Sequence, residues 1–140
     1  NNSNATTAAG MGVLNTAKNV NTSVLYGSYA GASKGATGLW GLTAIGHNAA
    51  RSIRSSSNYN ILVGSNSGIT NRQILGNIAL GANSLGSANS QGGYNVIAGA
   101  QTGGGLTTTS AIYNVILGSK YSTNTANRLA MMYTQLVILI

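Results

Sequence analysis

Six glycines recur along this chain, and each directly follows a short apolar run. Successive glycines are 19, 18, 17, 18 and 19 residues apart, at Gly27, Gly46, Gly64, Gly81, Gly99 and Gly118. A repeat of fixed period predicts an architecture in which each repeat stacks on the next, because one short unit cannot bury its apolar face alone. Each of these glycines is numbered position 0 of its repeat. A weaker seventh copy surrounds Gly10.

The three residues before each glycine predict a short β-strand. Position −3 is β-branched throughout, and positions −2 and −1 are apolar in nearly every copy, as in Ile61, Leu62 and Val63. A helix would need apolar residues three and four apart over ten or more positions, and the frequent glycines would destabilise it. The unit is therefore interpreted as a strand, a glycine turn, a short strand or turn, and a polar connector.

Polar residues also recur in register with the glycines. Position −4 is asparagine in the last four repeats, at Asn60, Asn77, Asn95 and Asn114. Three of these follow a tyrosine, namely Tyr59, Tyr94 and Tyr113. Stacked asparagines form amide ladders between neighbouring strands, so we expect a structural ladder here and not a ligand site. For the tyrosines we expect packing or contact between chains in preference to sugar stacking.

These patterns predict an all-β fold, a β-solenoid or β-helix of about six coils of 17–19 residues. We expect residues 1–20 to form an N-terminal cap or weak first repeat, 21–122 the six tandem repeats, and 123–140 a C-terminal junction or cap. Side chains alternate between the two faces of a strand, and both faces are apolar here. Since a lone solenoid needs only an apolar interior, the second apolar face predicts packing against sister chains, most simply as an intertwined homotrimer.

The residues that are missing exclude most catalytic chemistry. The chain has no Asp, Glu or Cys and a single histidine, His47. Without carboxylates there is no general acid–base pair, no third member for a Ser-His-Asp triad and no usual anchor for Mg²⁺ or Ca²⁺. Without thiols there is no Cys nucleophile and no Cys-ligated zinc. We therefore expect a protein that is not an enzyme, with no catalytic site, no metal and no cofactor, and a His47 that is solvated or hydrogen-bonded.

The positive charge is scattered. Lys and Arg number seven, giving a formal net charge of +7. The bases in connectors are Lys34, Arg51, Arg54, Arg72 and Arg128. They are candidates for contacts with anionic surface glycans or phosphates, although solubility and protection of sheet edges explain them more simply. Nucleic-acid binding needs clustered Lys and Arg side chains, so we do not expect it. No apolar run reaches the roughly 18 residues of a membrane helix, and no membrane span is expected.

Three units carry a resemblance to a known pattern. They are NYNILVGSNSG (Asn58–Gly68), GNIALGANSLG (Gly76–Gly86) and GYNVIAGAQTGG (Gly93–Gly104). They resemble the tandem TGSNNVAIGYNAG segments of phage tail fibres and of some bacterial surface proteins. The heads of trimeric autotransporter adhesins carry a related, shorter N-x-x-A-I-G unit. Leu42 and Thr43 depart from this pattern where Asn and Val are usual, and so does Tyr121, which replaces a small residue.

The resemblance implies a trimeric β-solenoid shaft on a virion, or outside a cell, that mediates attachment to a host-cell surface. Its implied partners are copies of itself, host surface glycans and other fibre or baseplate proteins. Two alternatives remain, a bacterial surface adhesin and an extracellular fibril resembling functional amyloid. An ice-binding solenoid is a minor alternative, because it needs a threonine in every coil and only Thr107, Thr108 and Thr109 form such a group.

Overall fold

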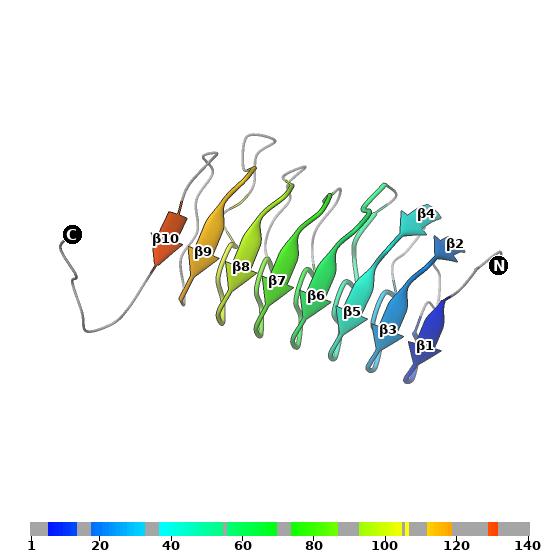
Figure 1. The fold of residues 1–140 in the computed structure, drawn as a ribbon. Helices are drawn as coiled ribbons and strands as arrows, with labels where there is room; N and C mark the ends of the chain where they lie inside the picture. The colour runs from blue at the N-terminus through cyan, green and yellow to red at the C-terminus, as the bar shows by residue number, and fades with distance from the viewer. Residues whose placement is uncertain are drawn as a thin grey trace.

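The computed structural model places every described strand in a parallel sheet (Figure 1). It describes residues 6–13, 18–32, 37–54, 56–69, 74–86, 93–104, 106, 112–118 and 129–131. Within these ranges there is no helix. The predicted all-β solenoid is therefore confirmed, and the glycine repeat fixes its period.

One long sheet takes one strand from each successive repeat. Its eight strands follow one another in the order of the chain. They are β1 (Thr7–Ala9), β3 (Val24–Tyr26), β5 (Thr43–Ile45), β6 (Ile61–Val63), β7 (Ile78–Leu80), β8 (Val96–Ala98), β9 (Val115–Leu117) and β10 (Leu129–Met131). A second parallel sheet holds only β2 (Lys18–Asn21) and β4 (Thr37–Trp40). This small sheet lies beyond the N-terminal ends of β3 and β5, and no repeated pattern in the sequence indicated it.

The register of the long sheet places equal repeat positions beside one another. Leu62 pairs with Ala44 in the preceding coil and with Ala79 in the following one. The long sheet also extends past the six repeats at both ends. Thr7 pairs with Val24, so the stretch before Gly10 is a further copy of the strand, and Leu129–Met131 adds to β9 at the other end.

Each of the six strands β3, β5, β6, β7, β8 and β9 buries its central residue and turns the flanking two outward, whereas all three residues of β1 are exposed. Position −2 is buried in every described repeat, at Leu25, Ala44, Leu62, Ala79, Ile97 and Ile116. The core is completed by apolar residues of the return path, among them Val20, Leu39, Ile53, Ile74, Leu85 and Leu106. The core of each coil is therefore a few side chains enclosed by its own backbone, stacked on the core of the next coil.

The turn after each strand explains why glycine is needed at position 0. Gly46 and Gly81 both have φ +130°, a conformation that L side chains rarely adopt. A Cβ on Gly81 would lie 2.5 Å from the carbonyl oxygen of Gly99, the same position in the next coil. The six repeat glycines share this positive φ, and the carbonyl of the next coil packs directly on each of the first five. Close packing of the coils therefore leaves no room for a side chain here.

Candidate interaction surfaces

The asparagines at position −4 form a buried ladder along the core. Oδ1 of Asn60 accepts the backbone N–H of Asn77 at 3.0 Å and its Nδ2–H at 3.3 Å. Asn95 donates in the same way to Asn77, at 3.1 and 2.9 Å, and Asn114 to Asn95, at 3.0 and 2.8 Å. All four side chains are at most 1% exposed. Because these buried amides are hydrogen-bonded to one another, the ladder holds coils together and is not accessible to a ligand.

A second polar column follows the glycine turn. Residues at position +2 adopt a left-handed backbone, with φ near 55° at Asn48, Asn66 and Asn83. Nδ2 of Asn48 donates to Oδ1 of Asn66 at 3.1 Å. At position +3 the hydroxyls of Ser67 and Ser84 are buried and lie 3.0 Å apart. These hydrogen bonds link neighbouring coils at the turn, so this column is structural as well.

The outward face of the long sheet is apolar and open to solvent. Positions −3 and −1 point away from the core. Val63 and Ile78 are half-buried there, and eight other large side chains are 36–64% exposed. They are Val24, Tyr26, Ile45, Ile61, Leu80, Val96, Val115 and Leu117. We call this set the apolar stripe. Among the described outward positions only Thr7 and Thr43 are threonines, and Thr107–Thr109 lie outside the described residues.

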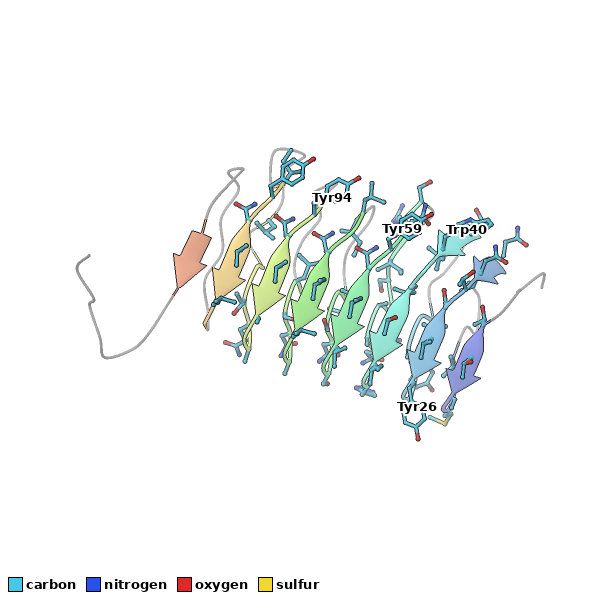
Figure 2. All side chains as sticks on the ribbon, viewed as in Figure 1. Tyr26, Trp40, Tyr59 and Tyr94 are labelled. Carbon is cyan, nitrogen blue, oxygen red and sulfur yellow. The ribbon has the colours of Figure 1, made fainter. Side chains whose placement is uncertain are left out.

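Exposed aromatic rings form a row where the chain enters four strands of the long sheet, β5, β6, β8 and β9. Trp40 is 49% exposed, Tyr59 65%, Tyr94 51% and Tyr113 56%. Figure 2 shows Trp40, Tyr59 and Tyr94 along one edge of the solenoid, with Tyr26 at the opposite edge. We call the four residues Trp40, Tyr59, Tyr94 and Tyr113 the aromatic row. The repeat predicted the three tyrosines in register, but not their exposure or their backbone conformation.

The basic side chains of the described connectors, Arg51 and Arg54, do not form a binding site with other basic residues. Arg51 and Arg54 are exposed on the same connector. The guanidinium carbon of Arg51 lies 5.6 Å from the centroid of the Tyr29 ring, a cation–π contact within the chain. Lys34, Arg72 and Arg128 lie outside the described residues. The proposed contacts of these bases with anionic groups therefore stay a prediction.

Leu42 and Thr43, which differ from the tail-fibre pattern, both fit the solenoid. Leu42 is fully buried, and its backbone N–H bonds to the Ser23 hydroxyl at 3.1 Å. Thr43 pairs in register with Val24 and Ile61. A buried leucine can thus replace the asparagine without loss of register. Tyr121, the other departure, lies outside the described residues.

The described residues offer little for covalent chemistry. His47 is exposed on the turn after β5. No group of three or more His, Cys, Asp or Glu side chains occurs in the described part of the chain. In the same residues, no helix is long and apolar enough to cross a membrane.

No protein-family model, curated protein or solved structure matches this chain. The functional assignment therefore depends on its own exposed surfaces, which are the apolar stripe and the aromatic row.

Proposed function

We propose that the chain is a stiff shaft segment of an attachment fibre, of the kind found in viral tail fibres, and that sister copies associate through the apolar stripe as a homotrimer. The observation that carries the proposal is the stripe itself, which follows the sheet from β3 to β9. A single solenoid buries its core without these side chains. Their exposure in one chain therefore favours association, which would remove them from water.

The dimensions of the stripe support association between copies. The six long-sheet strands from β3 to β9, about 4.8 Å apart and three residues wide, give a flat footprint of about 24 by 10 Å. An apolar patch of a few hundred Å² on one chain usually marks an interaction surface. A stable interface buries roughly 800 Å² per partner, so residues beside the stripe must share in the contact. Closed rotational symmetry would bury the same stripe on every copy.

The tightly bonded stack of coils is suited to act as a rigid spacer. Neighbouring coils are joined by the sheet ladder, by the asparagine ladder and by backbone bonds at the turn, such as Gly81 N–H to the Val63 carbonyl at 2.8 Å. A rod of this kind keeps a fixed length and presents its connectors at regular intervals. Such geometry supports a fibre on a virion or outside a cell, where it holds an attachment site away from the surface that carries it.

The mass of the purified chain in solution tests the proposal, measured by light scattering after gel filtration and by sedimentation. We expect a species of three chains. Replacing Ile61 and Leu80 together by lysine should give a folded single chain, because charged side chains would be buried in the interface. Ser65→Lys, an exposed turn residue of the same coil as Ile61, is the matched control and should leave three chains. A wild-type chain that stays single at every concentration would overturn the proposal.

The second candidate is an extracellular fibril that resembles functional amyloid, as part of a bacterial surface adhesin or by itself. One observation favours it: parallel strands in register with stacked asparagine amides are the arrangement of cross-β fibrils. The same measurement separates the two. Mass that grows without limit and elongated fibrils support the second candidate, whereas one fixed mass supports the shaft.

A further inference from the structure

The three tyrosines of the aromatic row occupy a backbone conformation that is unfavourable for them. Tyr59, Tyr94 and Tyr113 have φ of 57°, 58° and 56°. This left-handed region is a genuine outlier for a bulky residue and is adopted easily only by glycine and, less often, by asparagine. The conformation belongs to the position, since Gly41 and Gly76 occupy it with φ of 62° and 67° in other coils.

Burial does not compensate for this strain. More than half of each tyrosine stays exposed. Two rings cover a glycine of the preceding coil, Tyr59 over Gly41 and Tyr94 over Gly76, while Tyr113 stacks on Tyr94 with ring centroids 5.4 Å apart. The glycine coils show that the fold forms without a ring at this position. Thr22 also occupies this position, with φ of 52°, so neither glycine nor a ring is required there, and three exposed rings in register point to a function of the side chain.

The backbone holds the row at fixed intervals. The N–H of Tyr59 bonds to the Trp40 carbonyl at 2.7 Å, that of Gly76 to Asn58 at 3.0 Å, and that of Tyr94 to Leu75 at 2.8 Å. Successive positions are therefore one strand spacing apart, about 4.8 Å. Tyr59 and Tyr94 are two spacings apart, about 10 Å, and only Gly76 lies between them. An extended chain of equatorially linked sugar rings advances by about one such spacing per sugar.

The described stretches that carry the three tyrosines and Gly76 are uncharged. Residues 56–60, 74–77, 93–95 and 112–114 include no Lys, Arg or His, and the whole chain has no carboxylate side chain. Asparagine stands beside the rings at Asn58, whose Oδ1 accepts the Trp40 backbone N–H at 3.0 Å and whose amide nitrogen can donate outward. Aromatic faces with neighbouring amides suit the C–H and hydroxyl groups of a sugar. Nucleic acid would need basic side chains along the row to hold its phosphates.

We propose that the aromatic row is a binding site for a neutral polysaccharide with an extended, equatorially linked backbone, whose sugar rings stack on Tyr59 and on the Tyr94–Tyr113 pair. The inference names the ligand class of the attachment fibre and rests on that proposed function. It gives the shaft itself a role in attachment, through many weak contacts that repeat along the rod.

Three substitutions to asparagine test the site with the fold preserved. Tyr59→Asn, Tyr94→Asn and Tyr113→Asn, singly and together, remove the rings and keep a residue that tolerates positive φ. The matched control is Tyr29→Asn. Tyr29 has φ 56° and its ring covers Gly12, but it belongs to the turn at position +2, outside the row. Thermal melting of every variant checks the fold.

Binding is measured by titration calorimetry and by chemical-shift changes, with β-1,4-linked hexasaccharides of glucose and of N-acetylglucosamine as probes. An α-1,4-linked glucose hexasaccharide, which curves, is the comparison ligand, and a thymidine oligonucleotide is the nucleic-acid probe. We expect the β-linked probes to bind better than the α-linked one. Each single substitution should weaken binding by roughly tenfold, which corresponds to about 1.4 kcal/mol for each lost ring. The triple variant should not bind, and Tyr29→Asn should bind as wild type.

The results separate this inference from the proposed shaft. Loss of sugar binding without a drop in melting temperature and with an unchanged number of chains supports the site, whether that number is three or one. The inference is overturned if wild type binds no β-linked probe, if it prefers the oligonucleotide, or if the triple variant binds normally. It is also overturned if the triple variant melts earlier than wild type, or if it loses its sister chains, because the rings would then serve folding or assembly.

Discussion

The side-chain oxygen of Asn77 accepts two hydrogen bonds from Asn95, one from its backbone N–H at 3.1 Å and one from its Nδ2–H at 2.9 Å. Both residues are at most 1% exposed. One amide thus replaces a backbone carbonyl where the chain bends into the strand, and it does so in the same way at Asn60 and Asn95. Buried polar groups that are fully paired in this way specify one register and oppose slippage of the coils.

Removal of one amide from this ladder should be costly. In Asn77→Ala the N–H and the amide of Asn95 lose a shared acceptor inside the core, and we expect a loss of about 2–4 kcal/mol in the free energy of unfolding. Urea unfolding followed by circular dichroism measures it. Asn83→Gly is the control, since Asn83 is exposed and its φ of 54° suits glycine. A cost for Asn77→Ala no larger than that of the control would contradict the ladder.

A methyl group at position 0 should prevent close stacking of the coils. In Gly81→Ala the new Cβ meets the Gly99 carbonyl at a backbone φ of +130°, and we expect a loss of at least about 3 kcal/mol or no folded protein. In Gly38→Ala the new Cβ meets no atom within 4 Å, at a φ of +69°. Only the left-handed backbone is then unfavourable, and it should lower the free energy of unfolding by about 1–2 kcal/mol. Melting temperatures of the two variants should therefore differ clearly, and equal values would refute the packing argument.

Adjacent residues on opposite faces of β6 should affect different properties. Leu62→Ala empties the core and should cost about 2–5 kcal/mol in unfolding free energy. Ile61 is 39% exposed, so Ile61→Ala should cost about 1 kcal/mol or less in an isolated chain but weaken association of the copies. Urea unfolding of the single chain and sedimentation of the assembly measure the two effects. An Ile61→Ala variant that unfolds as easily as Leu62→Ala would show that the outward face is not free.

Tyr29→Asn should stabilise the chain. In the described structure Oδ1 of Asn48, directly after Tyr29 in the +2 column, is buried without a hydrogen-bond partner. An asparagine at residue 29 can donate to it, as Asn48 donates to Asn66, and it tolerates the φ of 56° better than tyrosine. Against this stands the lost contact with Arg51, about 0.5–1 kcal/mol. We expect a net gain of about 1 kcal/mol in a urea melt, with Tyr29→Phe near neutral. A lower stability of Tyr29→Asn would contradict this prediction, and would mean that packing of the Tyr29 ring over Gly12 contributes more than the new hydrogen bond.

Much of the fold could be predicted because parallel stacking places equal repeat positions beside one another. Once the glycines marked the period, the long-sheet strands β3 and β5 to β9 and their register followed, and so did the inward position of residues such as Leu62. The alternation within each strand likewise predicted an apolar outer face. These features depend only on the spacing of glycines and apolar residues along the chain, which can be read from the sequence.

Features that depend on the path of the backbone could not be predicted. The pairing of β2 with β4 depends on how two connectors bend, and their sequences do not repeat. The left-handed backbone at Tyr59 and Tyr94 runs against the preference of the residue, so propensity pointed away from it. The interval from β9 to Leu129–Met131 is shorter than that between any other neighbouring strands of the long sheet. No glycine follows Met131 at position 0, so the repeat gave no signal for this strand.

The hydrogen bonds of the long sheet lie along the axis of the rod, and each coil is bonded only to its neighbours. Under a strong pull along that axis we therefore expect single coils to be released from an end. Each 18-residue coil adds roughly 60 Å of extended chain when it comes away. We expect each release to absorb a similar amount of mechanical work, and a released coil to re-form on the coil below it when the tension falls.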